Sequence, residues 1–297
     1  MTVGAAFGID GLAAAAVRAG GRDTPPHLLH ARYLPFSGGG IADRLAEWVD
    51  EHDLNKCRGV GVIAGADYQV MQVETPPVPA TEMRQAAAWR VRDLVDFPLD
   101  QAVIDTFPPP TTAQRGQDNV NVVVAKRAAV TERIDQLKAA GLSLEAIDIP
   151  ELVQRNISLR LPEARGGHGL LALDEREGLI TVFREGEQFL ARALDTGRRD
   201  LQDAPEDAGE NLLLEVQRSF DYFDSALSQP PLGALYVHPA GRAESALLEL
   251  FGDNLSNIEL RAFGLGDVAT LDVDPPHEGA LMLHALGAGL RSEGKPA

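Results

Sequence analysis

Histidines, glycine runs and cysteine are the residues of this chain that catalytic or metal chemistry would use first. No histidine belongs to an H-E-x-x-H motif or stands beside cysteines at zinc-site spacing. His27 and His30 follow two prolines and could share a face, but we do not expect them to hold a metal. Neither a G-x-S-x-G nucleophile elbow nor a G-x-x-x-x-G-K-[ST] phosphate loop occurs. The sequence therefore shows no familiar enzyme chemistry.

A glycine run at 59–65, G-V-G-V-I-A-G, has some likeness to a dinucleotide-binding fingerprint. Such a site needs glycines that open a helix after a strand. Here a turn at 65–67 follows the apolar run, and another apolar stretch follows the turn. We therefore expect a strand, a turn and a second strand at this place.

Length and charge set the class of protein. The 297 residues suffice for two domains of about 150 residues each. Lys and Arg number 27 against 44 Asp and Glu, which gives a net charge of −17. A nucleic-acid binder needs a basic surface, and so does a protein that docks on anionic lipid through a polybasic patch. Both classes are disfavoured.

The single cysteine and the hydropathy pattern indicate a reduced, aqueous environment. Cys57 alone cannot form an intrachain disulfide or a multi-cysteine metal site. No stretch approaches the roughly 18 consecutive apolar residues of a membrane span, and residues 1–19 lack the early positive charge of a signal peptide. We expect a cytoplasmic protein with no direct membrane insertion, which reaches a membrane only through a partner.

The first part of the chain predicts a hairpin, a helix and two strands. Strands at 3–9 and 12–19 surround the tight-turn dipeptide Asp10-Gly11. Apolar residues recur at helical spacing over 41–51, and strands follow at 60–64 and 68–74. The proline-rich run at 75–79 then predicts a boundary.

A compact module follows that boundary. Met83, Ala87, Val91 and Leu94 step by four, four and three, which predicts one face of a helix that Pro98 ends. The pattern then predicts strands, a helix and an exposed loop, which we place as follows: strand 102–107, loop 108–118, strand 119–125, helix 130–141, strand 144–149. Helices on one face of a sheet indicate an α+β unit.

The second half repeats the opening pattern. Strands at 169–174, 179–183 and 189–194 predict another hairpin pair, and 198–210 is expected to be a polar loop. The remaining elements are expected to be a helix over 213–227, a strand at 234–237, helices at 246–250 and 279–290, and a disordered tail at 292–297. Two halves that begin alike predict a duplicated fold.

An ordered set of short segments gives the chain a family resemblance. The segments are M-Q-V-E-T-P at 71–76, D-F-P-L-D at 96–100, V-V-V-A-K-R at 122–127, L-K-A-A-G-L at 137–142, I-D-I-P-E at 147–151, L-E-V-Q-R-S-F-D-Y-F at 214–223 and L-Y-V at 235–237. Their order and spacing resemble the type IV pilus assembly proteins PilM and MshI, with the cytoplasmic half of GspL as a cousin. GspL carries a membrane span and this chain shows none, which favours PilM or MshI.

The resemblance implies an α/β, actin-like (FtsA-like) duplicated fold with an inserted strand-helix-strand-strand subdomain. It divides the chain into a first subdomain at 1–78 plus 150–165, an inserted subdomain at 79–149 and a second half at 166–291. It also implies a cytoplasmic scaffold that binds the tail of a PilN-like bitopic inner-membrane protein, near the pilus assembly ATPase. In PilM that tail lies between the first and the inserted subdomain.

The resemblance further implies a nucleotide cleft, whose elements are eroded here. Asp10 and Gly11 remain in the first hairpin, but alanines follow and no lysine does. In the second hairpin Asp174 is separated from Gly178 by the sequence E-R-E, which adds carboxylates beside the phosphate position. The loop after the strand at 234–237 has a single glycine where the family has a glycine-rich adenosine loop.

Three functions are compared, of which the third, a filament-forming actin relative, would be favoured by a long exposed hydrophobic loop that the sequence does not show. The leading one is a non-catalytic scaffold with no cofactor, in which Arg84, Arg90 and Arg92 on the helix at 81–95 meet an acidic partner tail; a solvated helix face is the alternative for these arginines. The competing function is a Mg-ATP-dependent ATPase, in which Asp10, Glu151 and Asp174 position the metal and water. An intact phosphate hairpin would favour the ATPase, and the sequence lacks one.

Overall fold

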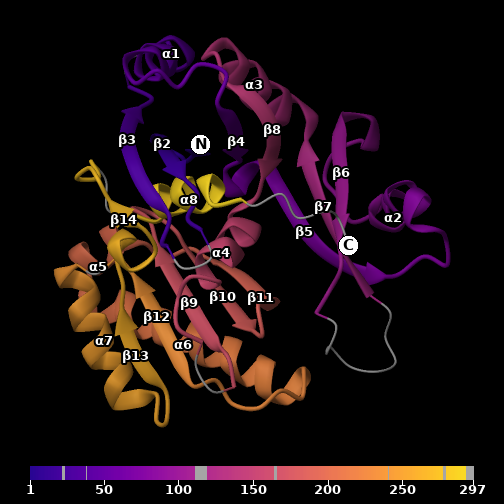
Figure 1. The fold of residues 1–297 in the computed structure, drawn as a ribbon. Coiled ribbons are helices and arrows are strands. Elements are labelled where there is room, and N and C mark those ends of the chain that lie inside the picture. Colours follow the sequence, from indigo (N-terminus) through magenta and orange to yellow (C-terminus); the bar gives the residue numbers. More distant parts are fainter. Residues whose placement is uncertain are drawn as a thin grey trace.

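The chain is described by a computed structural model over residues 1–21, 24–37, 39–110, 119–163, 166–239, 241–276 and 279–291. Three β-sheets organise it, and Figure 1 shows two of them stacked with helices between and outside them. The expected tail at 292–297 and most of the expected loop at 108–118 fall outside the described residues.

The first sheet has six strands in the order β14-β3-β2-β1-β4-β8. Antiparallel pairing joins β1, β2 and β3, whereas β4 lies parallel to β1 and β8 parallel to β4. The bounds of the strands are β1 (Thr2–Phe7), β2 (Gly11–Arg18), β3 (His27–Pro35), β4 (Arg58–Val62), β8 (Ser143–Asp148) and β14 (Thr270–Leu271). The predicted opening hairpin is confirmed, with Phe7 opposite Leu12 at its closed end.

The second sheet repeats this arrangement with five strands, in the order β11-β10-β9-β12-β13. Again three antiparallel strands are followed by two parallel ones on the other side of the first. The bounds are β9 (His168–Leu173), β10 (Gly178–Arg184), β11 (Glu187–Leu194), β12 (Ala234–His238) and β13 (Glu259–Ala262). The matching strand orders confirm the predicted duplication, although β13 and β14 were not predicted from the sequence.

Two helices fill the space between these sheets. They are α4 (Pro150–Ser158), which the sequence had not indicated, and the predicted α8 (Ala280–Gly289). Both helices belong to one hydrophobic core, in which Leu283 of α8 lies with Val60 of the first sheet and Leu170 of the second. Glycine lets α8 approach closely, because a Cβ at Gly4 would lie 2.0 Å from the carbonyl oxygen of Ala285. The two halves are therefore joined through a tightly packed helical layer.

The outer faces of the two sheets carry the remaining helices of each half. On the first sheet lie α1 (Ile41–Glu51) and α3 (Arg127–Ala139), and Trp48 and Leu137 share a core with β1 and β2. On the second lie α5 (Arg198–Asp203), α6 (Pro205–Asp221) and α7 (Arg242–Asn254), with a π-helical turn at Tyr222–Ala226 after α6.

The prediction of a loop at 198–210 is wrong, because α5 and the start of α6 occupy these residues. The Asp200 side chain accepts from the Gly197 amide in α5, and Pro205 stands in the first turn of α6, where its missing N–H is tolerated. The polar residues that suggested a loop belong largely to the exposed faces of these helices.

The third sheet is small, with three strands in the order β5-β7-β6 and one helix on its face. Its bounds are β5 (Tyr68–Glu74), β6 (Ala102–Phe107), β7 (Asn119–Lys126) and α2 (Met83–Val91). Ala87 and Val91 of the predicted α2 stripe pack on Val122 and Val124, but α2 ends at Val91 and Leu94 is 59% exposed. The strand-helix-strand-strand order of the inserted unit is present.

Sheet pairing groups the chain differently from the expected unit at 79–149. Strand β5, placed before the boundary, pairs along its whole length with β7. Strand β8, placed inside the unit, pairs with β4 in the first sheet, and α3 packs there with it. The proline run at 75–79 ends β5 and connects it to the segment that leads into α2. It interrupts the local structure, but the chain stays with the same small sheet on both sides of it.

Candidate functional site

Two hairpin turns, one from each of the stacked sheets, face each other. The β1–β2 turn carries Asp10 and the β9–β10 turn carries Arg176, whose Nε lies 3.7 Å from Oδ2 of Asp10. Both side chains are 54% exposed. Phe36 donates its backbone N–H to the Asp10 carbonyl at 2.9 Å, which holds the first turn on the end of β3. The structure thus brings together the two turns that the sequence had compared with phosphate-binding hairpins.

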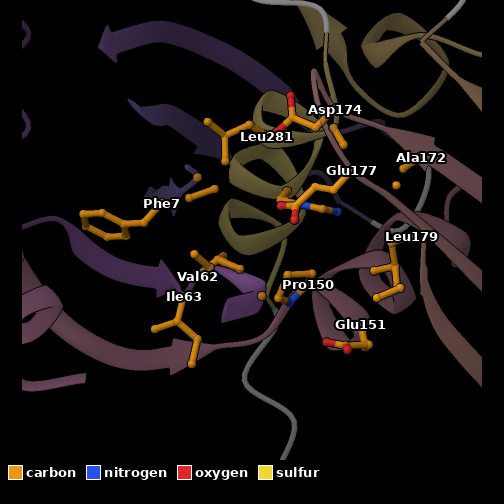
Figure 2. Close-up of a pocket in the computed structure, with 18 of the residues that line it drawn as sticks. Phe7, Val62, Ile63, Pro150, Glu151, Ala172, Asp174, Glu177, Leu179 and Leu281 are labelled. Carbon is orange, nitrogen blue, oxygen red and sulfur yellow. The ribbon is translucent and has the colours of Figure 1, made fainter. Parts of the chain in front are cut away.

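A small cavity lies inside these turns, between the sheets. Its volume is about 70 Å³, well below the roughly 300–1,000 Å³ of typical ligand pockets. Glu151, Asp174 and Gly178 of the predicted site line it, together with Glu177 and His284. Figure 2 shows Glu151 at the start of α4 and Asp174 and Glu177 in the second hairpin turn, with apolar side chains of the first sheet opposite.

Gly11 does not line this cavity. A Cβ at Gly11 would lie 2.7 Å from the Tyr33 hydroxyl and 2.7 Å from the Leu34 carbonyl oxygen. The glycine therefore makes room for the aromatic ring of the neighbouring strand β3. Its packing explains the residue type without a phosphate.

The cavity is acidic, and burial makes its carboxylates costly to ionise. Burial raises the pKa of Glu177, and the charges of Asp174 and Asp195 raise it further. Burial also raises the pKa of Glu151, although Tyr68 donates its hydroxyl to Glu151 Oε2 at 2.6 Å and opposes that shift. In their ionised form these carboxylates repel the phosphate groups of a nucleotide, and in their neutral form they supply no cation to hold them.

The nearby guanidinium groups already hold carboxylates of the chain itself. Arg198 lies 2.9 Å from Oε1 of Glu244, which is fully buried, and 3.5 Å from Oε1 of Glu175. The first backbone amides of α5 donate to the carbonyls of Asp174 and Glu175 at 2.8 and 2.9 Å. The cations and N–H groups closest to the second turn are therefore directed at the protein rather than at a ligand.

A side chain closes the end of β12, where the sequence resemblance implied an adenosine loop. A Cβ at Gly241 would lie 2.3 Å from Oε2 of Glu244, so this carboxylate lies directly over the glycine. His238 directs its Nδ1 at the Phe263 carbonyl oxygen at 3.1 Å. The site offers carboxylates and short apolar walls, a poor match to a nucleoside triphosphate.

A chain of buried polar side chains leads from His284, in the wall of the cavity, into the core. Thr181 donates its hydroxyl to Gln154 Oε1 at 2.7 Å, and Gln154 Nε2 lies 3.2 Å from Nε2 of His284. Burial lowers the pKa of His284 to about 4. The ring is therefore neutral at neutral pH and acts as a hydrogen-bonding core residue.

Of the three arginines that we expected to meet a partner, Arg84 and Arg90 lie on α2 and Arg92 directly follows it, and none of them lines this cavity. About half or more of each side chain is exposed, and each guanidinium already has a carboxylate within 4 Å. Arg84 pairs with Asp105, Arg90 with Glu74, and Arg92 with Asp93. Figure 1 places α2 at the right-hand edge of the molecule.

A second, larger concavity was missed by the sequence reasoning. It has a volume of about 480 Å³ and lies between β5 of the third sheet and β11 of the second. Its other walls come from residues of β6, β7 and the π-helical turn, and Glu151 lines both this concavity and the smaller cavity. The signal available in the sequence was β5 itself, Y-Q-V-M-Q-V-E, which has no charge before its last residue.

Among the described residues, no group of three or more His, Cys, Asp or Glu side chains is placed to hold a metal ion. His27 lies 3.2 Å from Asp272, and His30 stacks on His52 at 4.1 Å between ring centroids. Across that same part of the chain, none of the helices is both long and apolar enough to cross a bilayer.

Comparison with solved structures identifies the fold. A chain of a PilM–PilN type IV pilus biogenesis complex matches this one at 20% identity and a TM-score of 0.72. The match covers 97% of this chain and 97% of the other. The chain has the actin-like fold of PilM. The cytoplasmic domain of EpsL, an inner-membrane component of the Vibrio cholerae type II secretion system, matches over 98% and 95% at 12% identity and a TM-score of 0.55.

A third structure agrees on the fold. A Bacteroides thetaiotaomicron protein of unknown function with an actin-like ATPase fold matches 87% of this chain and 90% of its own, at 10% identity and a TM-score of 0.52. No protein-family model matches the sequence. No curated protein matches it either.

Proposed function

We propose that this protein is a non-catalytic scaffold of type IV pilus biogenesis, of the PilM or MshI kind. It binds the cytoplasmic tail of a PilN-like bitopic protein and so works in the cytoplasm, at the inner membrane, beside the assembly ATPase. The observation that carries the proposal is the likeness to PilM in a PilM–PilN complex, over 97% of both chains. The likeness to the EpsL cytoplasmic domain supports an assembly role of the same kind.

The chemistry of the cleft favours a scaffold over an ATPase. A triphosphate would need cationic or N–H donors around its oxygens. At this place the chain instead presents Glu151, Asp174 and Glu177 around a cavity of about 70 Å³. The arginine closest to the first hairpin, Arg176, is paired with Asp10. On this account the ion pair and the α8 layer, rather than a nucleotide, connect the two halves.

Co-purification tests the proposal. The protein is mixed with the detergent-solubilised PilN-like protein of the same organism, and with a matched form that lacks only its cytoplasmic tail. We expect the intact partner to be retained and the tail-deleted form to be lost. Equal retention of both forms, or of neither, contradicts the proposed function.

A further inference from the structure

The three-stranded sheet and its helix α2 are attached to the rest of the molecule as a small unit. The unit has a core of its own, with Val91 of α2 against Val122 of β7, and Figure 1 shows it beside the two stacked sheets. It meets the first sheet in a smaller cluster, whose buried members are Ile63, Ala125 and Ile149. A unit with its own core and a small contact is expected to move relative to its neighbours.

The chain enters and leaves this unit at one place. It enters through a short turn at Gly65–Asp67 that leads directly into β5, and it leaves at Lys126, where β7 runs directly into α3. The Lys126 ammonium donates to the Ala66 carbonyl oxygen at 3.0 Å, so the two connections lie side by side. Nothing lies within 4 Å of the Cβ position of Gly65, and glycine has more backbone freedom than other residues. The two connections therefore form a hinge.

A short hydrogen bond fixes the unit beside this hinge. Tyr68, the first residue of β5, donates its hydroxyl to Oε2 of Glu151 at 2.6 Å. Glu151 lies in the first turn of α4, between the two stacked sheets, and is 9% exposed. A hydrogen bond to an ionised carboxylate is about twice as strong as one between neutral groups. The bond thus ties the small unit to the helical layer that joins the two halves.

The same pair separates two hollow spaces. Tyr68 and Glu151 line the inner cavity of about 70 Å³ and also the concavity of about 480 Å³ between β5 and β11. Gly65 and Ala193 are the other residues that line both spaces. Because glycine and alanine carry little or no side chain, the hydrogen-bonded pair forms the partition.

The charge of Glu151 sets the strength of the bond. Burial raises the pKa of Glu151, the bond from Tyr68 opposes this rise, and the charge of Asp148 on β8 adds to it. Burial, together with Glu151, raises the pKa of Tyr68 well above its usual value, so its hydroxyl remains a donor. The other titratable or charged groups around the pair are the arginine that holds Asp148 and three residues of the inner cavity, namely Arg291, Asp174, Glu177 and His284. Protonation of Glu151 removes the charge from the acceptor and weakens the bond.

We propose that Tyr68 and Glu151 form a releasable latch. With the latch closed, the three-stranded sheet is fixed against α4 and the two spaces are separate. With the latch open, the sheet turns about its two connections and the spaces merge. Protonation of Glu151 favours the open state, so mild acid is the signal to which the latch responds. The latch goes beyond the proposed function, because it needs neither a partner nor a nucleotide.

Distance measurements by pulsed electron paramagnetic resonance test whether the sheet moves. Cys57, the single cysteine, is replaced by serine, and spin labels are attached through Gln85→Cys on α2 and Gln202→Cys on α5, both at exposed positions. At pH 7.5 we expect one narrow distance distribution, and addition of Tyr68→Phe should broaden it about twofold or more. Tyr222→Phe is the matched control, since Tyr222 lines the same concavity and its hydroxyl makes no hydrogen bond within the described residues.

Amide hydrogen exchange tests the release without labels. The backbone N–H of Ile63 donates to the Asp148 carbonyl oxygen at 3.1 Å, just before the hinge. Tyr68→Phe should speed its exchange about tenfold, and Glu151→Gln, which keeps an uncharged acceptor, should speed it less. At pH 5, after correction for the intrinsic exchange rate, the wild type should move toward Glu151→Gln. Amides of α6 should keep their rates, because α6 packs on the second sheet.

The outcomes decide for or against the latch. Faster exchange at Ile63 with unchanged α6, together with the broader distance distribution, supports it. A result for Tyr68→Phe like that of Tyr222→Phe in either measurement overturns it. Equal acceleration at Ile63 and throughout α6 also overturns it, because the hydroxyl would then serve general stability. Each of these failures leaves the proposed function standing, since none of the measurements includes a partner.

Discussion

Arg176 and Asp10 belong to hairpin turns of different sheets, and the Arg176 Nε lies 3.7 Å from Asp10 Oδ2. These are the turns that the sequence analysis compared with phosphate-binding hairpins. Here the aspartate that the sequence suggested as a metal-positioning group faces a guanidinium of the same chain. The ion pair gives the two halves a direct link at this place.

Removing this link should change stability little and should not create a nucleotide site. Both side chains are 54% exposed, so Arg176→Ala should cost less than about 1 kcal/mol of unfolding free energy. Millimolar Mg-ATP or Mg-ADP should leave the thermal unfolding midpoint of the wild type unchanged, and that of the variant as well. The reason is that both proteins keep the carboxylates around the cavity. A clear rise of the wild-type midpoint with nucleotide would favour the ATPase instead.

His284 should make the protein sensitive to mild acid. Its pKa in the folded state is lowered from 6.5 to about 4 by burial. A group whose folded pKa lies below its unfolded pKa loses stability as the pH falls through the unfolded value, here over pH 6.5 to about 4. The loss attributable to His284 is about 2 kcal/mol between pH 7.5 and pH 5.

Urea unfolding of wild type and His284→Gln at those two pH values measures this loss. Glutamine keeps a polar partner for Gln154, and the raised pKa values of Glu151 and Glu177 act equally in both proteins. The variant should lose less stability on acidification than the wild type. Identical losses would mean that His284 is not buried as a neutral ring.

The α8 layer predicts a severe effect of a small substitution at Gly4. A Cβ there would lie 2.0 Å from the Ala285 carbonyl oxygen and 2.7 Å from the Gly289 nitrogen. Gly4→Ala should therefore destabilise the protein by about 3 kcal/mol or more. Gly264→Ala is the control, since nothing lies within 4 Å of its Cβ position, and it should be nearly neutral. Equal effects of the two changes on the denaturation midpoint would contradict the packing.

The three arginines on and directly after α2 should contribute little to partner binding. The side chains of Arg84, Arg90 and Arg92 are 71%, 49% and 54% exposed. The carboxylates that they pair with are exposed as well. The triple change to alanine should leave affinity for the tail peptide within about twofold and stability within about 0.5 kcal/mol. A tenfold loss of affinity in the same calorimetric titration would return these residues to the binding site.

The sequence predicted the repeated parts of the fold because they rest on local signals. The turn dipeptide Asp10-Gly11 and the alternation around it predicted the first hairpin, and the 169–194 pattern predicted the second. It failed for pairings between distant strands. Nothing local to β5 states that it joins β7, more than 40 residues away, rather than β4 beside it.

For the candidate site too, some features could be predicted from the sequence and others could not. Residue types alone indicated an acidic, lysine-free cleft, and the structure brings Glu151, Asp174 and Gly178 together there. The link between Asp10 and Arg176, and the concavity beside Gln188, depend on how two sheets meet. Such relationships have no signature in the order of residues along one strand.

The central claim is that the protein holds a partner's tail without help from a nucleotide. Calorimetric titration of the PilN-like tail peptide into the full-length protein, with and without millimolar Mg-ATP, tests it most directly. The account predicts saturable one-to-one binding with the same affinity in both conditions. Binding that is absent, or that appears only with Mg-ATP, would contradict it.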